Sequence, residues 1–146
     1  IWDEDGKLVA EQDVDPELAS STIVSLQHYG SLFFASAKNY EAQLPKPCKD
    51  TRNAVVILNM DGQEDPDSTV LDMLTEYAQV LQKHQCRLML AGVGDSFQQK
   101  IERTGKIAII GDENVFTVSV HYDESVLKAH ESAETWIKEQ ESILNI

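Results

Sequence analysis

Apolar residues along the chain fall either into short uninterrupted runs or into longer stretches with helical spacing. Residues 54–58 form a continuous run rich in β-branched side chains, which is typical of a strand covered on both faces of a parallel sheet. Residues 87–91 form a second such run. Further strands are predicted at residues 22–26, 29–33 and 115–120, and the turn between the first two makes a hairpin plausible.

Stretches with helical spacing lie between these runs and predict about four α-helices. Their positions are residues 33–44, 68–84, 96–103 and a final helix whose core face carries Val126, His130, Ala133, Trp136 and Ile137. Residues 92–94, with the sequence GVG, are predicted to form a loop. The alternation predicts an α/β fold with a central mixed or mostly parallel β-sheet flanked by helices.

A length of 146 residues suits one domain. Residues 1–21 are polar and acidic, so we expect a lead-in or linker there and the domain at residues 22–146. The sequence has neither a run near the ~20 apolar residues of a membrane-spanning helix nor a signal peptide, so we expect a water-soluble chain. The first residue is Ile1 rather than Met, which fits a segment of a longer polypeptide.

Charge narrows the classes of partner. The chain has 25 acidic and 12 basic side chains, for a formal net charge of -13. A field of this sign repels phosphate backbones and anionic lipid surfaces, so we expect neither nucleic-acid binding nor direct lipid binding. A basic partner surface and simple solubility both remain open as explanations.

Several segments, taken in order, point to a family. They are SLQHYGSLFFASAKNYEAQLP from residue 25, AVVILNM, DSTVLDMLTEYAQVL, RLMLAGVGDSFQQKIERTG, IIGDENVF and AETWI. Together they resemble the STAS domain, the C-terminal cytoplasmic domain, of SulP-family anion transporters, with a cyanobacterial-type bicarbonate transporter as the preferred member. The resemblance implies the STAS fold, a cytoplasmic location beneath the cell membrane, and a carrier for bicarbonate or sulfate. It also implies contact with the transmembrane domain of the same polypeptide and a homodimer.

The resemblance also marks one candidate regulatory site. In stand-alone STAS regulators a helix opens with Asp-Ser-x-Gly, and a partner kinase phosphorylates the serine. Asp67, Ser68 and Thr69 occupy the matching place here, but Val70 replaces the glycine. A phosphate there would gain from the helix N-terminus, yet acidic residues surround the position. The ordinary interpretation is that one of these three residues caps the helix.

Other residues with possible chemistry have ordinary explanations. Cys48 and Cys86 belong to no CxxC pair, so two reduced thiols are expected, with neither a disulfide nor a zinc site. The acidic loop at residues 61–67 lacks the EF-hand spacing, and the GVG segment lacks the rest of a phosphate-binding motif. The four histidines are scattered along the chain at His28, His84, His121 and His130. His130 lies on the final helix, and we expect its side chain to be buried and hydrogen-bonded.

The sequence therefore predicts no catalytic residue, no cofactor and no metal, and we do not expect an enzyme. The leading hypothesis is an interaction module that assembles or regulates a SulP-type carrier. A stand-alone partner-switching regulator, similar to an anti-sigma factor antagonist and phosphorylated at Ser68, is the alternative. A small nucleotide-binding protein or enzyme of flavodoxin-like architecture rests on fold analogy alone.

Overall fold

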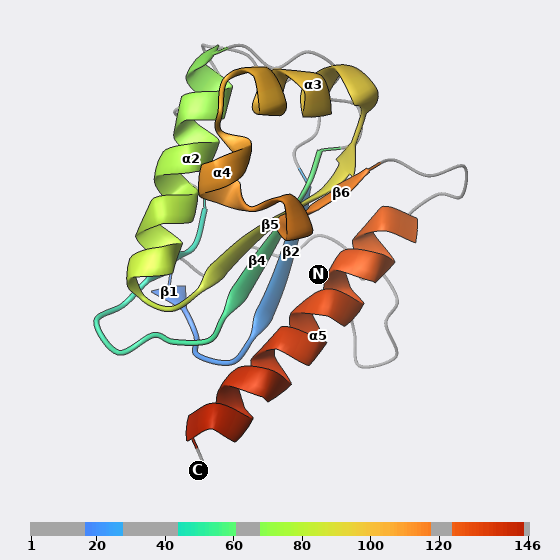
Figure 1. Cartoon of the computed structure of the whole chain (residues 1–146). Coiled ribbons are helices and arrows are strands. Elements are labelled where there is room, and N and C mark those ends of the chain that lie inside the picture. The colour runs from blue at the N-terminus through green and yellow to red at the C-terminus, as the bar shows by residue number, and fades with distance from the viewer. Residues whose placement is uncertain (1–16, 28–43, 61–67, 118–123, 145–146) are drawn as a thin grey trace.

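A four-stranded parallel sheet organises the chain in the computed structural model, in the order β2-β4-β5-β6 (Figure 1). The strands are β2 (Ile23–Gln27), β4 (Val55–Asn59), β5 (Arg87–Val93) and β6 (Val115–Thr117). Every residue of β4 is buried, as the run of apolar β-branched residues predicted, because helices cover both faces of a parallel sheet. The predicted α/β fold with a mostly parallel sheet is confirmed.

The structure describes residues 17–27, 44–60, 68–117 and 124–144. Some predictions lie outside these ranges, namely the strand at residues 29–33, nearly all of the helix at 33–44 and the last part of the strand at 115–120.

Three of the predicted helices are present where the helical spacing placed them. They are α2 (Ser68–Lys83), α3 (Asp95–Arg103) and α5 (Glu124–Leu144). Phe97 and Ile101 of α3 point inward as predicted, and both are fully buried. Two short helical elements were not predicted, the helix α4 (Ile107–Ile110) and the 3-10 turn η1 (Asp112–Asn114). Both are too short for the 3.6-residue spacing of a helix to be recognised in the sequence.

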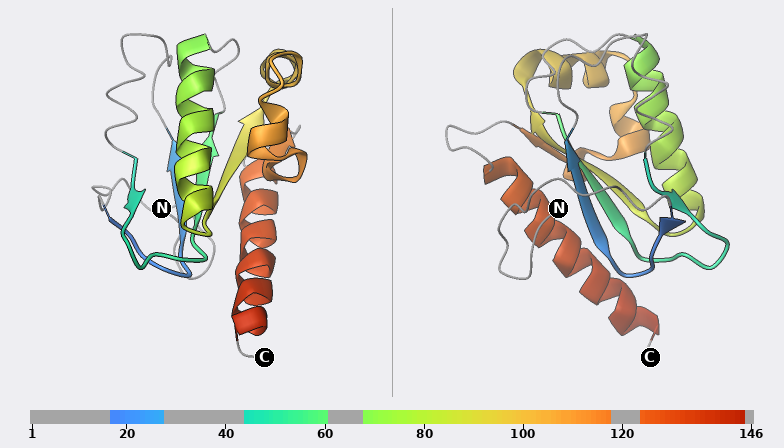
Figure 2. Two further views of the ribbon diagram at one scale, coloured as in Figure 1. Left: turned by 60° about the vertical axis from the view of Figure 1, so that its left-hand side comes forward. Right: turned by 180° about the vertical axis from the view of Figure 1, so that it is seen from behind.

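The helices pack on opposite faces of the sheet and create two buried clusters (Figure 2). Because side chains alternate along a strand, Val56 and Leu58 face the cluster under α2, whereas Val55 and Ile57 face the one under α5. The α5 cluster contains three fully buried alanines, Ala91 of β5 and Ala129 and Ala133 of α5. The larger α2 cluster also holds Phe97 of α3 and Ile110 of α4. The sheet is thus the middle of three layers.

Two parts of the structure differ from the expected boundaries. Within the predicted lead-in, β1 (Glu17–Leu18) pairs in parallel with β3 (Lys46–Pro47), and Leu18 is buried in the α2 cluster. The predicted loop at residues 92–94 is wrong for two of its three positions, because β5 continues through Val93. Gly92 keeps its place in the strand with a φ of 65°, a value that glycine tolerates without strain.

Candidate functional site

The candidate regulatory residues lie at the start of α2. Ser68 is the first residue of the helix and is exposed, whereas the next residue, Thr69, is half-buried. Asp67 lies outside the described residues, so capping of the helix by Asp67 stays a prediction. Val70, which replaces the glycine of the stand-alone regulators, is fully buried in the core under α2. The exposed Ser68 hydroxyl is therefore the accessible group of this site.

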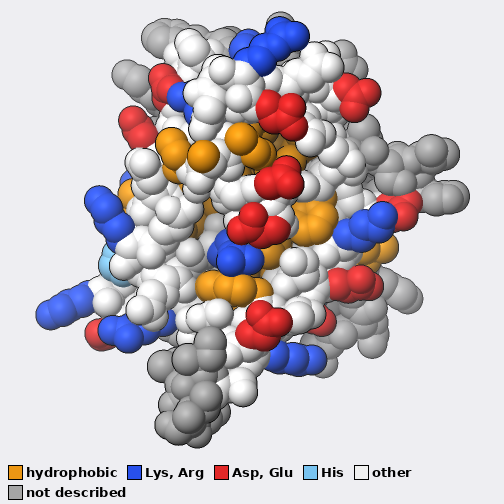
Figure 3. Space-filling model, viewed as in Figure 1, with side chains coloured by type: hydrophobic (Ala, Val, Ile, Leu, Met, Phe, Trp, Pro, Cys, Tyr) orange, Lys and Arg blue, Asp and Glu red, His pale blue; other side chains and the backbone are white. Residues whose placement is uncertain are grey.

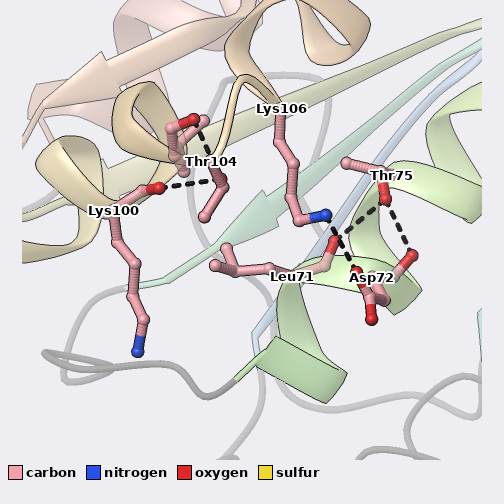
Figure 4. A network of polar contacts seen from close by, with 7 residues as sticks. Leu71, Asp72, Thr75, Lys100, Thr104 and Lys106 are labelled. Carbon is pink, nitrogen blue, oxygen red and sulfur yellow. Dashed lines mark hydrogen bonds and ion pairs between the residues drawn. The ribbon is translucent and has the colours of Figure 1, made fainter.

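Polar contacts join the first turns of α2 to the segment around α4 (Figure 4). Lys106 Nζ lies 2.8 Å from Asp72 Oδ1. One turn further along α2, the Thr75 hydroxyl donates to the backbone oxygens of Leu71 and Asp72. On the facing segment the Thr104 hydroxyl donates to the backbone oxygen of Lys100. Lys106 thus brings a positive charge next to the opening of α2, a contact that the sequence did not reveal.

These contacts determine how the site can respond to a phosphate. Ser68 and Asp72 are four residues apart and therefore neighbours on the helix surface. A phosphate on Ser68 would gain from the positive end of the helix dipole but would meet the Asp72 carboxylate. Lys106 already binds that carboxylate. Phosphorylation of Ser68 stays a prediction.

At the carboxyl end of β5 the chain passes through Gly94 directly into α3, without a phosphate-binding loop. Gly94 precedes α3 with an extended φ of -79°, and its backbone oxygen accepts from the Gln98 N–H. The first residue of α3 is Asp95, whose negative charge suits a helix N-terminus and repels a phosphate. The Gly92 N–H donates to the buried Ser125 hydroxyl of α5 at 2.9 Å. The geometry therefore supports a structural role for Gly92 and Gly94 rather than a role in phosphate binding.

The histidine prediction on the final helix needs a correction. His130 is only partly buried, and its Nδ1 lies 3.3 Å from Glu134 Oε1 on the same helix. The buried stripe of α5 instead runs through Val126, Ala129 and Ala133, because Ala129 takes the position next to the sheet. Trp136 is also half-buried and packs at the border of that cluster. His28 and His121 lie outside the described residues.

The two thiols are both free and lie in different environments. Cys48 is exposed and Cys86 is buried. Burial raises the pKa of the Cys86 thiol, and a hydrogen bond with the backbone of Ala54 partly offsets this effect. Within residues 17–27, 44–60, 68–117 and 124–144, no three His, Cys, Asp or Glu side chains are grouped as metal binding requires. The acidic loop at residues 61–67 lies outside that part of the chain.

No helix in the described part of the chain has the length and apolar character needed to cross a bilayer.

Comparison with known proteins identifies the class. The STAS domain family matches residues 16–123, which is most of the chain. The protein therefore belongs to the STAS domain family, as the ordered motifs predicted. No curated protein matches the sequence.

Solved structures share the fold. A sulfate transporter family protein from Wolinella succinogenes superposes with a TM-score of 0.65 at 24% identity, covering 88% of this chain and 99% of the other. The SulP transporter STAS domain from Vibrio cholerae gives 0.55 at 21% identity, with coverages of 81% and 88%. Murine Slc26a9, an anion transporter in the inward-facing state, gives 0.58 at 16% identity, and 79% of this chain corresponds to 18% of that protein.

Proposed function

We propose that this chain is the assembly and regulatory domain of a SulP-type membrane anion carrier. The observation that carries the proposal is the near end-to-end likeness to the sulfate transporter family protein from Wolinella succinogenes, with 88% of this chain and 99% of the other covered. Membership of the STAS domain family and the likeness to the SulP domain from Vibrio cholerae support the same assignment. In murine Slc26a9 the matching part is 18% of a much longer transporter.

In this proposal the domain works through contact with other protein rather than by catalysis. Its partners are the transmembrane domain of the same polypeptide, on the cytoplasmic side of the membrane, and a second copy of the domain. The net charge of -13 disfavours nucleic acid and anionic lipid as partners, because both carry the same sign. The proposed cargo is an oxyanion, bicarbonate or sulfate, and its selection belongs to the membrane part.

Uptake measurements on the parent carrier test the proposal. Cells carry the parent protein with Ile57, fully buried in β4, changed to Asp, which unfolds the domain by burying an unpaired charge. We expect the carrier amount in the membrane, or the uptake of labelled bicarbonate or sulfate per carrier, to fall. Glu139→Gln on the exposed side of α5 is the matched control and should leave both unchanged. Normal carrier amount and uptake in the Ile57→Asp cells would overturn the proposal.

The alternative is a stand-alone partner-switching regulator, and the exposed Ser68 at the start of α2 is the observation in its favour. The chain and its Ser68→Ala variant are incubated with lysate of the source cells and ATP. Mass spectrometry then locates phosphate. A phosphate that is present on the wild type and absent from the variant supports the alternative. An unmodified chain, in lysate whose kinases modify an added control substrate, removes it.

A further inference from the structure

Four exposed cations gather at the end of the domain where the strands β4 and β5 begin. They are Lys46 of β3, Lys49 and Arg52 before β4, and Lys83 at the end of α2. The Asn53 N–H donates to the Gln85 oxygen at 3.1 Å, so the segment before β4 lies beside the one that follows α2. Figure 3 shows Lys and Arg side chains at the lower left, where α2 ends in the same view of Figure 1. We call these four residues the basic end.

Carboxylates beside the basic end do not balance its charge. Lys106 and Lys128 each bind a carboxylate, whereas none of the four cations of the basic end has such a pair within the described residues. The carboxylates adjacent to them in the chain or in the β1–β3 register are Asp50 and Glu17. Four cations and two carboxylates leave a surplus of two positive charges, in a chain whose net charge is -13. Such a surface attracts a negatively charged segment.

The acidic lead-in has the matching charge and joins the domain beside these cations. Residues 1–16, which lie outside the described residues, carry six carboxylates and one lysine, a formal net charge of -5 (six minus one). The carboxylates are Asp3, Glu4, Asp5, Glu11, Asp13 and Asp15.

Hydrogen bonds hold the first described residues after the lead-in against the basic end. The Arg52 N–H donates to Ser20 Oγ at 3.0 Å, and the Ser21 N–H donates to the Arg52 oxygen at 3.0 Å. Asp15 precedes Ser20 by five residues, and five extended residues span at most about 18 Å. The last carboxylates of the lead-in can therefore reach the basic end while β1 and β3 stay in place.

We propose that residues 3–15 bind the basic end of the same chain through their carboxylates. A tether of this length gives the lead-in an effective concentration on the order of 1 mM, which any separate chain must exceed. A second copy carries the same net charge of -13 and is repelled at long range. Each exposed ion pair is weak, so the contact depends on several pairs at once and loosens as salt screens them.

Cys48 offers a reporter position within the basic end. It is exposed whereas Cys86 is buried, so a nitroxide reagent labels Cys48 in the native protein. The Cys48 N–H donates to Thr51 Oγ1 at 2.8 Å, which holds the backbone at the label in place. The amide signals of residues 3–15 are then compared between the oxidised and the reduced label. We expect the oxidised label to weaken them at least about twofold at roughly 0.01 M ionic strength and much less at about 1 M, where the screening length is about 3 Å.

Charge reversal distinguishes a bound lead-in from one that is merely tethered nearby. The test variant combines Arg52→Glu with Lys83→Glu, two exposed positions whose change leaves the core intact. Lys100→Glu with Arg103→Glu, both on α3, is the matched control because it changes the net charge equally. We expect the weakening of the signals of residues 3–15 to be lost in the test variant and kept in the control. Equal weakening in wild type and in both variants overturns the proposal.

A mixed sample shows whether the occupant belongs to the same chain. Spin-labelled chains without isotope are mixed with isotope-labelled chains that lack the nitroxide, so only contacts between chains weaken the observed signals. Weakening as large as in the doubly labelled chain would assign the basic end to a second copy and overturn the proposal. If the charge-reversed variant does not fold, the six carboxylates of the lead-in are changed instead to the corresponding amides. Wild-type weakening in that variant would count equally against the contact.

Discussion

Three glycines differ in the contacts that an added side chain would make. A comparison of the three therefore distinguishes the effect of backbone strain from that of steric overlap. A Cβ on Gly94 has nothing within 4 Å, and its φ is negative. Gly105 has equally open space but a φ of +74°. Gly111 has a φ of +98°, and its Cβ would lie 2.7 Å from Asn114 Nδ2. That nitrogen donates to the Ile110 oxygen at 2.7 Å, so it cannot move without losing its hydrogen bond.

Alanine at these positions should therefore destabilise the fold in a fixed order. We expect a loss of about 0.5 kcal/mol for Gly94→Ala, from the helix N-cap alone. Gly105→Ala should cost about 1 kcal/mol, for the left-handed backbone. Gly111→Ala should cost about 2–3 kcal/mol, because strain and overlap add. Urea unfolding measures all three, and equal values for Gly105→Ala and Gly111→Ala would contradict the overlap with Asn114.

The two cysteines allow a second test at the residue scale. Exposed Cys48 should react with a thiol reagent in the native protein, whereas buried Cys86 should react only on unfolding. Because burial raises the pKa of Cys86, its contribution to stability is complete below the ordinary thiol pKa. The contribution is lost as the pH rises from that value toward the folded pKa, because the unfolded chain ionises first. Urea titrations of wild type and Cys86→Ala should therefore differ less in alkaline solution than at neutral pH, and a constant difference would contradict this linkage.

Close approach of α5 to the sheet depends on small residues, and this is a property of the element as a whole. Ala129 and Ala133 are both fully buried against the cluster under α5. A larger side chain there must push the helix away from β4 and β5, because the interior has no spare volume. The small size of Ala129 and Ala133 is thus as important for the packing of α5 as the larger apolar residues beside them.

Ala133→Leu should accordingly lower the free energy of unfolding by about 1–3 kcal/mol, the usual cost of overpacking a core. Glu131→Leu, on the exposed side of the same helix, adds a comparable side chain without this crowding and should change stability by less than about 0.5 kcal/mol. Thermal or urea unfolding of the pair distinguishes them. A smaller loss for Ala133→Leu than for Glu131→Leu would show that α5 can shift without penalty.

The excess of negative charge acts on the whole molecule. A net charge of -13 on one domain produces repulsion that the folded chain, being more compact, feels more strongly than the unfolded chain. Raising the ionic strength from 0.01 M to 0.15 M shortens the screening length from about 30 Å to about 8 Å. We therefore expect the midpoint of thermal unfolding to rise over this range. Sodium and potassium chloride should give the same rise, and a falling midpoint would show that attractive ion pairs dominate.

The sequence alone determined the central layers of this protein. The runs at β4 and β5, the spacing along α2 and the inward positions of Phe97 and Ile101 all follow from local periodicity. That periodicity exists because a buried strand is apolar throughout and a covered helix is apolar on one side. The order of motifs likewise led to the STAS domain family.

Only the tertiary structure decided the contacts between distant segments. The pairing of β1 with β3, the partial exposure of His130 and the stacking of Arg87 on Trp136 leave no periodic signal. Nor does the sequence show that Lys106 binds Asp72 beside the candidate regulatory serine. The physical reason is that such contacts depend on where whole layers pack. A pattern of neighbours along the chain reports which side of an element is buried, but not which residue of another element lies opposite.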